Sequence, residues 1–136
     1  MHIKRIMKGI LVSLVVVTLV SSCTMKTKTL EPYRINIDSL SAPDTVNART
    51  IFDVKIFGYV GPSKCYAYEK VYIYTTTLNE IVIEAWGKYT YVGDPCADEI
   101  VMLNQTVETS VSTPGVYTIK ALNSNLGYLT KTLVAK

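Results

Sequence analysis

Polar and apolar residues alternate over several short segments of this chain. The clearest segment is residues 50–60, whose apolar row is formed by Phe52, Val54, Ile56 and Val60, with Gly58 among them. Asp53 and Lys55 lie on the other side of that row. Because successive side chains of a strand point to opposite faces, this alternation predicts a β-strand with one buried face, which we expect to end at residues 61–63.

Two further segments alternate in the same way and predict two strands that form a hairpin. The first segment, residues 65–76, has Ala67, Val71 and Ile73 on one side and Tyr66, Tyr68, Tyr72 and Tyr74 on the other. The second segment has Ile81, Ile83 and Ala85 on one side and Val82, Glu84 and Trp86 on the other.

The register of this hairpin follows if both aliphatic rows face the same core. Ile73 must then lie opposite Ile83, which leaves a three-residue loop at residues 77–79. Asn79 suits the left-handed backbone position at the end of such a loop. The register also predicts an aromatic face on the opposite side of the sheet, formed by Tyr72, Tyr74, Val82 and Trp86, with Tyr74 across from Val82, Tyr72 across from Glu84 and Lys70 across from Trp86.

Weaker signals indicate strands before and after this hairpin. Residues 33–38 alternate briefly and predict a first strand, and residues 39–47 consist of turn-forming residues. Residues 100–103 form a continuous apolar run, which is compatible with a strand buried on both faces.

The last third of the chain completes the set of strands. Residues 104–113 lose the alternation, although we expect Val107 and Val111 to reach the core. Residues 128–134 predict a terminal strand. A total of about seven short strands, with no convincing amphipathic helix, indicates an all-β fold in which two antiparallel sheets form a sandwich.

Pro114, Gly115 and Tyr117 form a proline-glycine turn followed by a tyrosine-bearing strand. This stretch resembles the corresponding region of immunoglobulin-like and fibronectin type III-like domains, in which a tyrosine hydroxyl often bonds to upstream backbone. The resemblance implies an immunoglobulin-like sandwich.

The N-terminus differs from the rest of the chain. Three basic residues, Lys4, Arg5 and Lys8, precede an apolar run at residues 9–20. This run has about a dozen residues, whereas a helix needs roughly 20 apolar residues to cross a bilayer. A basic start, a short apolar run and small residues at its end are typical of a removable signal peptide.

The apolar run ends in Val20-Ser21-Ser22-Cys23, which resembles the lipobox of bacterial lipoprotein precursors. The resemblance implies that signal peptidase II cleaves before Cys23, that the cysteine sulfur receives a diacylglycerol and that the new amine is acylated. A short uncleaved anchor, or an ordinary secretory signal, is the alternative.

Lipidation of this cysteine divides the chain into a signal peptide at residues 1–22, a lipidated tether at 23–32 and a β-sandwich domain at 33–136. Burial of acyl chains contributes about 0.8 kcal/mol per methylene group, so two or three chains anchor a protein durably. We therefore expect a protein of the bacterial cell envelope whose domain lies outside the cytoplasm. In many proteobacterial lipoproteins an aspartate directly after the lipidated cysteine retains the protein in the inner membrane. This chain has Thr24 at that position, and by this resemblance the outer membrane is favoured.

The net charge changes when the signal segment is set aside. Residues 1–22 contain three of the 14 basic residues and none of the 11 acidic residues, so the rest of the chain is balanced. Binding of nucleic acid depends on a basic patch. The balance therefore argues against a nucleic-acid partner.

Assignment of one of the three cysteines to lipid leaves Cys65 and Cys96 as a pair. An extracytoplasmic location permits a disulfide. On the chain-entropy model, a bridge that closes a loop of this size stabilises the fold by about 3 to 4 kcal/mol. Two buried free thiols are the alternative.

The residue types available argue against catalysis. The single histidine, His2, lies in the signal segment, so the domain lacks an imidazole base, an imidazole metal ligand and a histidine-activated nucleophile. Asp94, Asp98 and Glu99 could supply oxygen ligands to calcium, but their spacing matches no calcium loop and we expect a solvated acidic turn. We therefore predict a non-catalytic protein without a metal or another cofactor.

The aromatic face is the one positive indication of function. Flat aromatic side chains stack on sugar rings and anchor contacts between proteins. The leading hypothesis is an accessory protein that binds another protein, and the alternative is a carbohydrate-binding lipoprotein that uses Tyr72, Tyr74 and Trp86. Tyrosine also has a high strand propensity, so outward tyrosines can be ordinary strand residues, and Trp86 would belong to the core if both faces of the sheet were covered.

Overall fold

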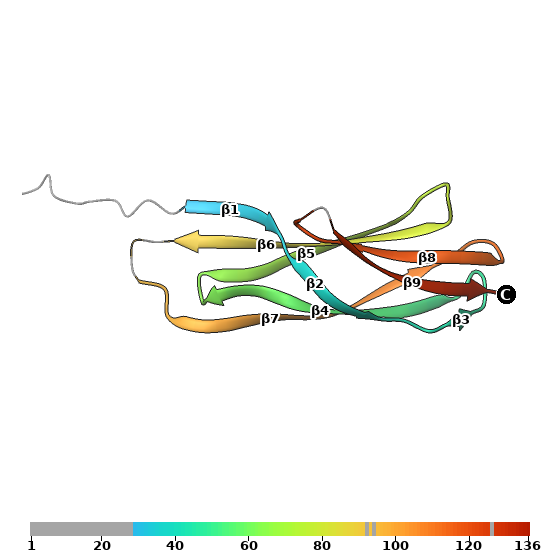
Figure 1. Ribbon diagram of the computed structural model, residues 1–136, viewed down its shortest axis with the longest axis horizontal. Helices are drawn as coiled ribbons and strands as arrows, with labels where there is room; N and C mark the ends of the chain where they lie inside the picture. The colour runs from blue at the N-terminus through green and yellow to red at the C-terminus, as the bar shows by residue number, and fades with distance from the viewer. Residues whose placement is uncertain (1–28, 92, 94, 126) are drawn as a thin grey trace, which may run out of the picture.

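The computed structural model describes residues 29–91, 93, 95–125 and 127–136, and within these residues it contains β-strands and no helix (Figure 1). The strands are β1 (Thr29–Arg34), β2 (Asn36–Ser41), β3 (Thr45–Val46), β4 (Ile51–Ser63), β5 (Tyr66–Thr75), β6 (Glu80–Tyr91), β7 (Asp98–Ser110), β8 (Gly115–Leu122) and β9 (Tyr128–Ala135). They form two packed sheets, which confirms the predicted all-β sandwich and is compatible with an immunoglobulin-like arrangement.

Some of the predictions for the N-terminus lie outside the described residues. These are the signal peptide at residues 1–22, the lipidated Cys23 and the tether up to residue 28. Strand β1 already begins at Thr29, within the segment expected to be a tether.

The larger sheet has six strands and the smaller sheet has three. In the larger sheet the order is β1-β6-β8-β9-β3, with β5 also paired to β6, and in the smaller sheet the order is β2-β4-β7. The β6–β8 and β3–β9 pairs are parallel, whereas the sequence led us to expect antiparallel pairs only. The β6–β8 pair is parallel because the chain crosses to the other sheet as β7 and returns as β8 in the direction of β6.

Strand β6 is paired along both edges. One edge pairs with β5, from Thr75↔Ile81 to Tyr66↔Tyr89. The other edge is shared, because β8 pairs with residues 80–84 of β6 and β1 pairs with residues 86–91. Strand β6 is therefore the centre of the larger sheet.

The first predicted strand is divided between the two sheets. Strand β1 pairs with β6 in the larger sheet and β2 pairs with β4 in the smaller sheet. The chain crosses at Ile35, which is buried and whose N–H donates to the carbonyl oxygen of Ala85 at 2.8 Å. Residues 33–38 were thus wrongly predicted as one strand, because the alternation of Ile35 and Ile37, which both lie in the core, does not show that the chain changes sheets between β1 and β2.

The hydrophobic core lies between the sheets and includes the predicted row of β4. Phe52, Val54, Ile56 and Val60 are all buried. They pack in one cluster with the inward row of β6 and with residues of β8 and β9, namely Ile81, Ile83, Ala85, Ile119, Ala121 and Leu133. Strand β4 continues to Ser63, three residues beyond the predicted end at Val60, because Gly61 and Ser63 still pair with β7.

The register predicted for the β5–β6 hairpin is confirmed. Ile73 lies opposite Ile83, and the outward pairs Tyr74↔Val82, Tyr72↔Glu84 and Lys70↔Trp86 are all present. The N–H of Thr76 donates to the carbonyl oxygen of Glu80 at 2.8 Å and closes the three-residue loop. Asn79 has a φ of 55°, the left-handed conformation that its position requires.

A β-bulge in β5 corrects one part of this prediction. The register with β6 shifts between Tyr68 and Lys70, and an extra residue in a strand reverses the faces of the residues that precede it. Tyr66 and Tyr68 therefore pack against the core together with Val71, and do not share the outer face with Tyr72.

Strand β7 was predicted incorrectly as a segment buried on both faces. It is an outer strand of the smaller sheet, and the side chains of Ile100 and Met102 are 68% and 61% exposed. Leu103 faces the core, and the strand continues to Ser110 through residues expected to be irregular. Val107 and Val111 do reach the core, as predicted.

The proline-glycine turn leads into β8, where Tyr117 is buried. Its hydroxyl donates to the backbone oxygen of Thr113 at 3.0 Å, and thus fastens the strand to the turn before it. The predicted terminal strand is present as β9, which pairs antiparallel with β8.

The predicted disulfide joins Cys65 and Cys96, whose Cα atoms lie 5.6 Å apart. It connects the start of β5 in the larger sheet to the segment before β7 in the smaller sheet. The N–H of Lys64 donates to the carbonyl oxygen of Ala97 at 3.0 Å, and its amine lies 2.9 Å from Glu99 Oε2. The disulfide thus links the two sheets at this end, and the contacts of Lys64 extend the pairing of β4 with β7.

Three half-buried tyrosines form a cluster at the same end. The ring of Tyr66 lies 5.7 Å from that of Tyr33 and 4.9 Å from that of Tyr89, measured between centroids. The Tyr33 hydroxyl donates to the carbonyl oxygen of Val60 at 2.8 Å. A Cβ on Gly87 would collide with the Tyr33 ring, so this position requires glycine. Burial, followed by the neighbouring tyrosines, raises the pKa of Tyr33 to about 12.

We expect the Tyr33 hydroxyl to make the fold sensitive to alkaline pH. Its pKa is about 12 in the folded chain and 10.0 ordinarily, so the stabilisation is complete below pH 10 and is lost as the pH rises from 10 to 12. Tyr33→Phe should lower the free energy of unfolding at neutral pH by about 1 kcal/mol, and should reduce its alkaline decline. Urea unfolding between pH 8 and pH 12 measures both effects. Tyr128→Phe, at a ring that is 57% exposed, is the control, and an unchanged decline in Tyr33→Phe would contradict this role.

Candidate functional site

The four residues predicted to form the aromatic face lie together on the outer side of the larger sheet. Tyr72 and Tyr74 on β5 are each 48% exposed, and Trp86 on β6 is half-buried. Val82 is on the same side but is only 4% exposed, between its cross-strand neighbours Tyr74 and Lys120. Val82 therefore supports the tyrosine and does not itself offer a contact surface.

A carboxylate in the middle of this face fixes the aromatic side chains. The Tyr74 hydroxyl donates to Glu84 Oε1 at 3.2 Å, and the Trp86 indole N–H donates to Oε2 at 3.3 Å. Arg34 Nη2 donates to the same Oε2 atom at 3.2 Å and forms an ion pair with it. The Glu84 side chain is 15% exposed, so a poorly hydrated charge is compensated by three donors from three strands.

The Arg34 side chain lies over the outer face of the sheet because β1 pairs Arg34 directly with Trp86. Its guanidinium carbon is 5.4 Å from the centroid of the Trp86 ring, a cation–π contact. Within the described residues, Arg34 Nε is the one buried side-chain polar atom without a hydrogen-bond partner. Arg34 is thus held by Glu84 and by the indole.

Two other aromatic rings on this side are also paired with cations. The amine of Lys70 lies 4.9 Å from the centroid of the Tyr72 ring, and that of Lys120 lies 4.4 Å from the centroid of the Tyr128 ring. The surface therefore alternates rings and charges. Burial raises the pKa of Tyr74, and the Glu84 carboxylate raises it further, so its hydroxyl stays protonated to a higher pH than that of an ordinary tyrosine.

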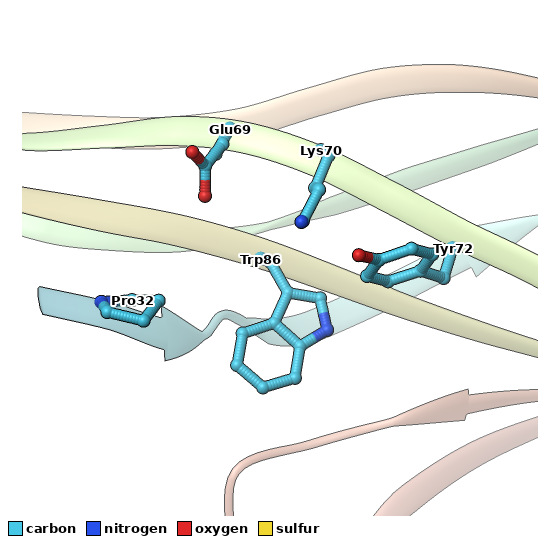
Figure 2. Close-up of a pocket in the computed structure, with 5 residues that line it drawn as sticks. All are labelled: Pro32, Glu69, Lys70, Tyr72 and Trp86. Atoms are coloured by element: carbon cyan, nitrogen blue, oxygen red, sulfur yellow. The ribbon is translucent and has the colours of Figure 1, made fainter.

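A shallow cavity of about 190 Å³ opens beside Trp86 (Figure 2). Its lining combines apolar rings with one acid and one base, and consists of Pro32, Glu69, Lys70, Tyr72 and Trp86. Figure 2 shows the indole between Pro32 and Tyr72, with the Glu69 and Lys70 side chains extending from β5. The β-bulge in β5 lies next to this cavity, a position where bulges often re-aim side chains.

Sequence reasoning missed Arg34 and Glu84 as members of this site. Arg34 was assigned to a single first strand, so its pairing with β6 was not expected. Glu84 could have been found from the sequence, because it lies in the predicted outward row between Val82 and Trp86. A carboxylate that is shielded from water by such large neighbours requires hydrogen-bond or ionic partners.

The arrangement presents ordered aromatic rings and charges on an outward surface. The Glu84 carboxylate is occupied by three donors, and within the described residues no group of three histidine, cysteine, aspartate or glutamate side chains could hold a metal ion. Asp98 and Glu99 are exposed, while Asp94 lies outside the described residues. No helix in the described part of the chain has the length and apolar character needed to span a membrane.

No protein-family model, no curated protein and no solved structure matches this chain. Function is therefore inferred from the geometry of the site.

We expect Glu84→Ala to release the aromatic side chains that the carboxylate holds. Loss of three hydrogen bonds around a poorly hydrated charge should lower the free energy of unfolding by about 1 to 3 kcal/mol. Because Trp86 is the only tryptophan, its fluorescence should shift to longer wavelength and become easier to quench with iodide. Glu99→Ala is the control, since that carboxylate is 58% exposed and pairs only with Lys64. Identical emission from the Glu84→Ala variant and the unaltered protein would show that the carboxylate does not position the indole.

Proposed function

We propose that this protein is a lipid-anchored, extracytoplasmic component of the bacterial cell envelope that binds another protein and catalyses no reaction. The outer side of the larger sheet, centred on Arg34, Tyr72, Tyr74 and Trp86, is the proposed docking face. The observation that carries the proposal is the Glu84 network, which orders large side chains on an outward surface where the core does not require them.

The anchor is supported by the lipobox-like sequence Val20-Ser21-Ser22-Cys23. Strand β1 enters at one end of an elongated sandwich, and β9 finishes at the other end (Figure 1). Only residues 24–28 separate Cys23 from β1, and six residue steps span at most about 20 Å. A lipid on Cys23 would therefore hold that end of the domain close to the membrane and present the aromatic face to the side.

The composition of the face favours a protein partner. Tryptophan, tyrosine and arginine are the residues most enriched at the energetic centres of protein interfaces. Side chains that are already fixed by hydrogen bonds and cation–π contacts lose less conformational entropy when a partner docks. The face also mixes charges, with Glu69 and Lys70 at its margin, which suits the polar rim of such an interface.

Carbohydrate binding is the second candidate, and the cavity beside Trp86 is the observation that favours it. A sugar ring could stack on the indole while Glu69 and Lys70 bond to its hydroxyl groups. Arg34 already lies over the Trp86 ring, and Lys70 over the Tyr72 ring, so less aromatic surface is available for stacking. We therefore place the protein partner first.

A photo-crosslinking amino acid at position 72 tests the docking face in living cells. We expect a discrete adduct with the mass of a second protein, which should disappear when Trp86→Ala is added and the fold is intact by circular dichroism. The same amino acid at Ser39, exposed on β2 in the other sheet, is the control and should give no such adduct. Saturable binding on a glycan array that Trp86→Ala abolishes, without a protein adduct, would replace the protein partner with a carbohydrate.

Replacement of the lipid-bearing residue tests the anchor separately. Cys23→Ala should leave the precursor uncleaved or release a soluble domain, because signal peptidase II acts before a lipidated cysteine. Fractionation of cells, followed by mass measurement of the protein, distinguishes the forms. Unchanged membrane partitioning and processing in Cys23→Ala would rule out the proposed anchor.

A further inference from the structure

Strand β7 forms an edge of the smaller sheet. Residues 98–110 pair with β4 along one side, and no described residue pairs with the other side. At about 3.3 Å per residue the strand is roughly 40 Å long, and Figure 1 shows it running along the boundary of the sandwich. The structure therefore presents a long row of backbone donors and acceptors at this boundary.

The other boundary strands carry the features that normally block strand addition, which are shortness, bulges and charged side chains such as lysine. Strand β5 has the bulge at Glu69 and a lysine beside it, β2 has six residues and a register shift, and β3 has two residues. Strand β1 has six residues and contains Pro32. Strand β9, whose residues 128–133 pair with β8 alone, carries Lys131.

Strand β7 contains neither proline nor lysine. Its register with β4 is unbroken over residues 102–110, and the two shifts in this register are confined to the first residues of the strand, between Asp98 and Met102. Among the boundary strands of the described chain, β7 is thus the least protected.

Apolar side chains stand beside this edge. Ile100 and Met102 of β7 are 68% and 61% exposed, and Tyr59, which lies opposite Met102 on β4, is 41% exposed. Side chains of an added strand would pack against such a row, and cross-strand apolar pairs stabilise a sheet.

The charge of the strand indicates what kind of segment fits. Strand β7 carries Asp98 and Glu99 at one end, Glu108 near the other end and no basic residue. A second copy of β7, paired antiparallel over the full length, would bring Glu108 of one chain close to Asp98 and Glu99 of the other. Like charges oppose that arrangement, whereas basic residues near the ends of the incoming strand would be attracted.

We propose that the free edge of β7 binds an extended segment of another protein by strand addition. The segment has apolar residues opposite Ile100 and Met102 and basic residues opposite Glu108 and Asp98. Main-chain hydrogen bonds supply affinity in this mode, and alternate side chains supply specificity. The site is separate from the aromatic face on the other sheet, so it stands whether or not that face docks a protein.

A synthetic peptide tests the proposal on the full-length chain purified in detergent. The peptide is as long as β7 and rich in threonine, with valine and isoleucine opposite Met102 and Ile100, and lysine opposite Glu108 and Asp98, in antiparallel pairing. We expect saturable binding by fluorescence anisotropy, weaker binding at high salt, and slower backbone hydrogen exchange in residues 98–110. A peptide with glutamate in place of lysine should bind at least about tenfold more weakly.

Matched variants locate the binding. Met102→Lys should weaken binding of the peptide by about tenfold or more, because lysine on an edge opposes strand addition. Val116→Lys is the control, since Val116 on β8 is also 61% exposed but lies on the other sheet. The proposal is overturned if no peptide binds, if both peptides bind equally, or if exchange slows outside β7. It is also overturned if the chain itself forms a dimer that Met102→Lys dissociates, since the occupant is then a second copy.

Discussion

The pairing of β6 along both of its edges is the constraint on which the rest of this structure depends. Its inward row, including Ile81 and Ile83, is fully buried against the smaller sheet. The orientation of its outward row is fixed, because β5 pairs with one edge of β6 and β1 and β8 pair with the other. Glu84 and Trp86 are consequently held on an outer face with neighbours on both sides, and the carboxylate acquires the donors that a poorly hydrated charge requires.

The two proposed binding surfaces, the aromatic face and the β7 edge, belong to different sheets and would bind partners through different interactions. The aromatic face is made of side chains that are already ordered, so recognition there would depend on shape and on desolvation of rings. The β7 edge offers backbone groups, so recognition there would depend on an extended chain that completes a ladder. The disulfide between Cys65 and Cys96 links the sheets at one end and limits how far these surfaces can move relative to one another.

Local patterns were enough to predict the β5–β6 hairpin, and non-local pairing was not. The alternation around Ile73 and Ile83, together with the conformational tolerance of Asn79, determines the register without knowledge of any other strand. Nothing in the sequence marks the bulge beside Glu69, because inserting one residue leaves each flanking segment alternating as before. Arg34 was missed for a related reason: its role depends on pairing with a strand 50 residues away. Residues 100–103 of β7 are all apolar, so the sequence does not show which of them are exposed and which are buried. The structure shows that Ile100 and Met102 are exposed and that Leu103 is buried.

A single carboxylate, that of Glu84, orders the aromatic face, and hydrogen exchange at the Trp86 indole N–H tests this role most directly. Because the chain has one tryptophan, nuclear magnetic resonance spectra should contain one indole N–H signal to follow. The Glu84 network predicts that this proton exchanges with solvent much more slowly than in free indole, and that Glu84→Ala restores rapid exchange. Rapid exchange in the unaltered protein would contradict the account.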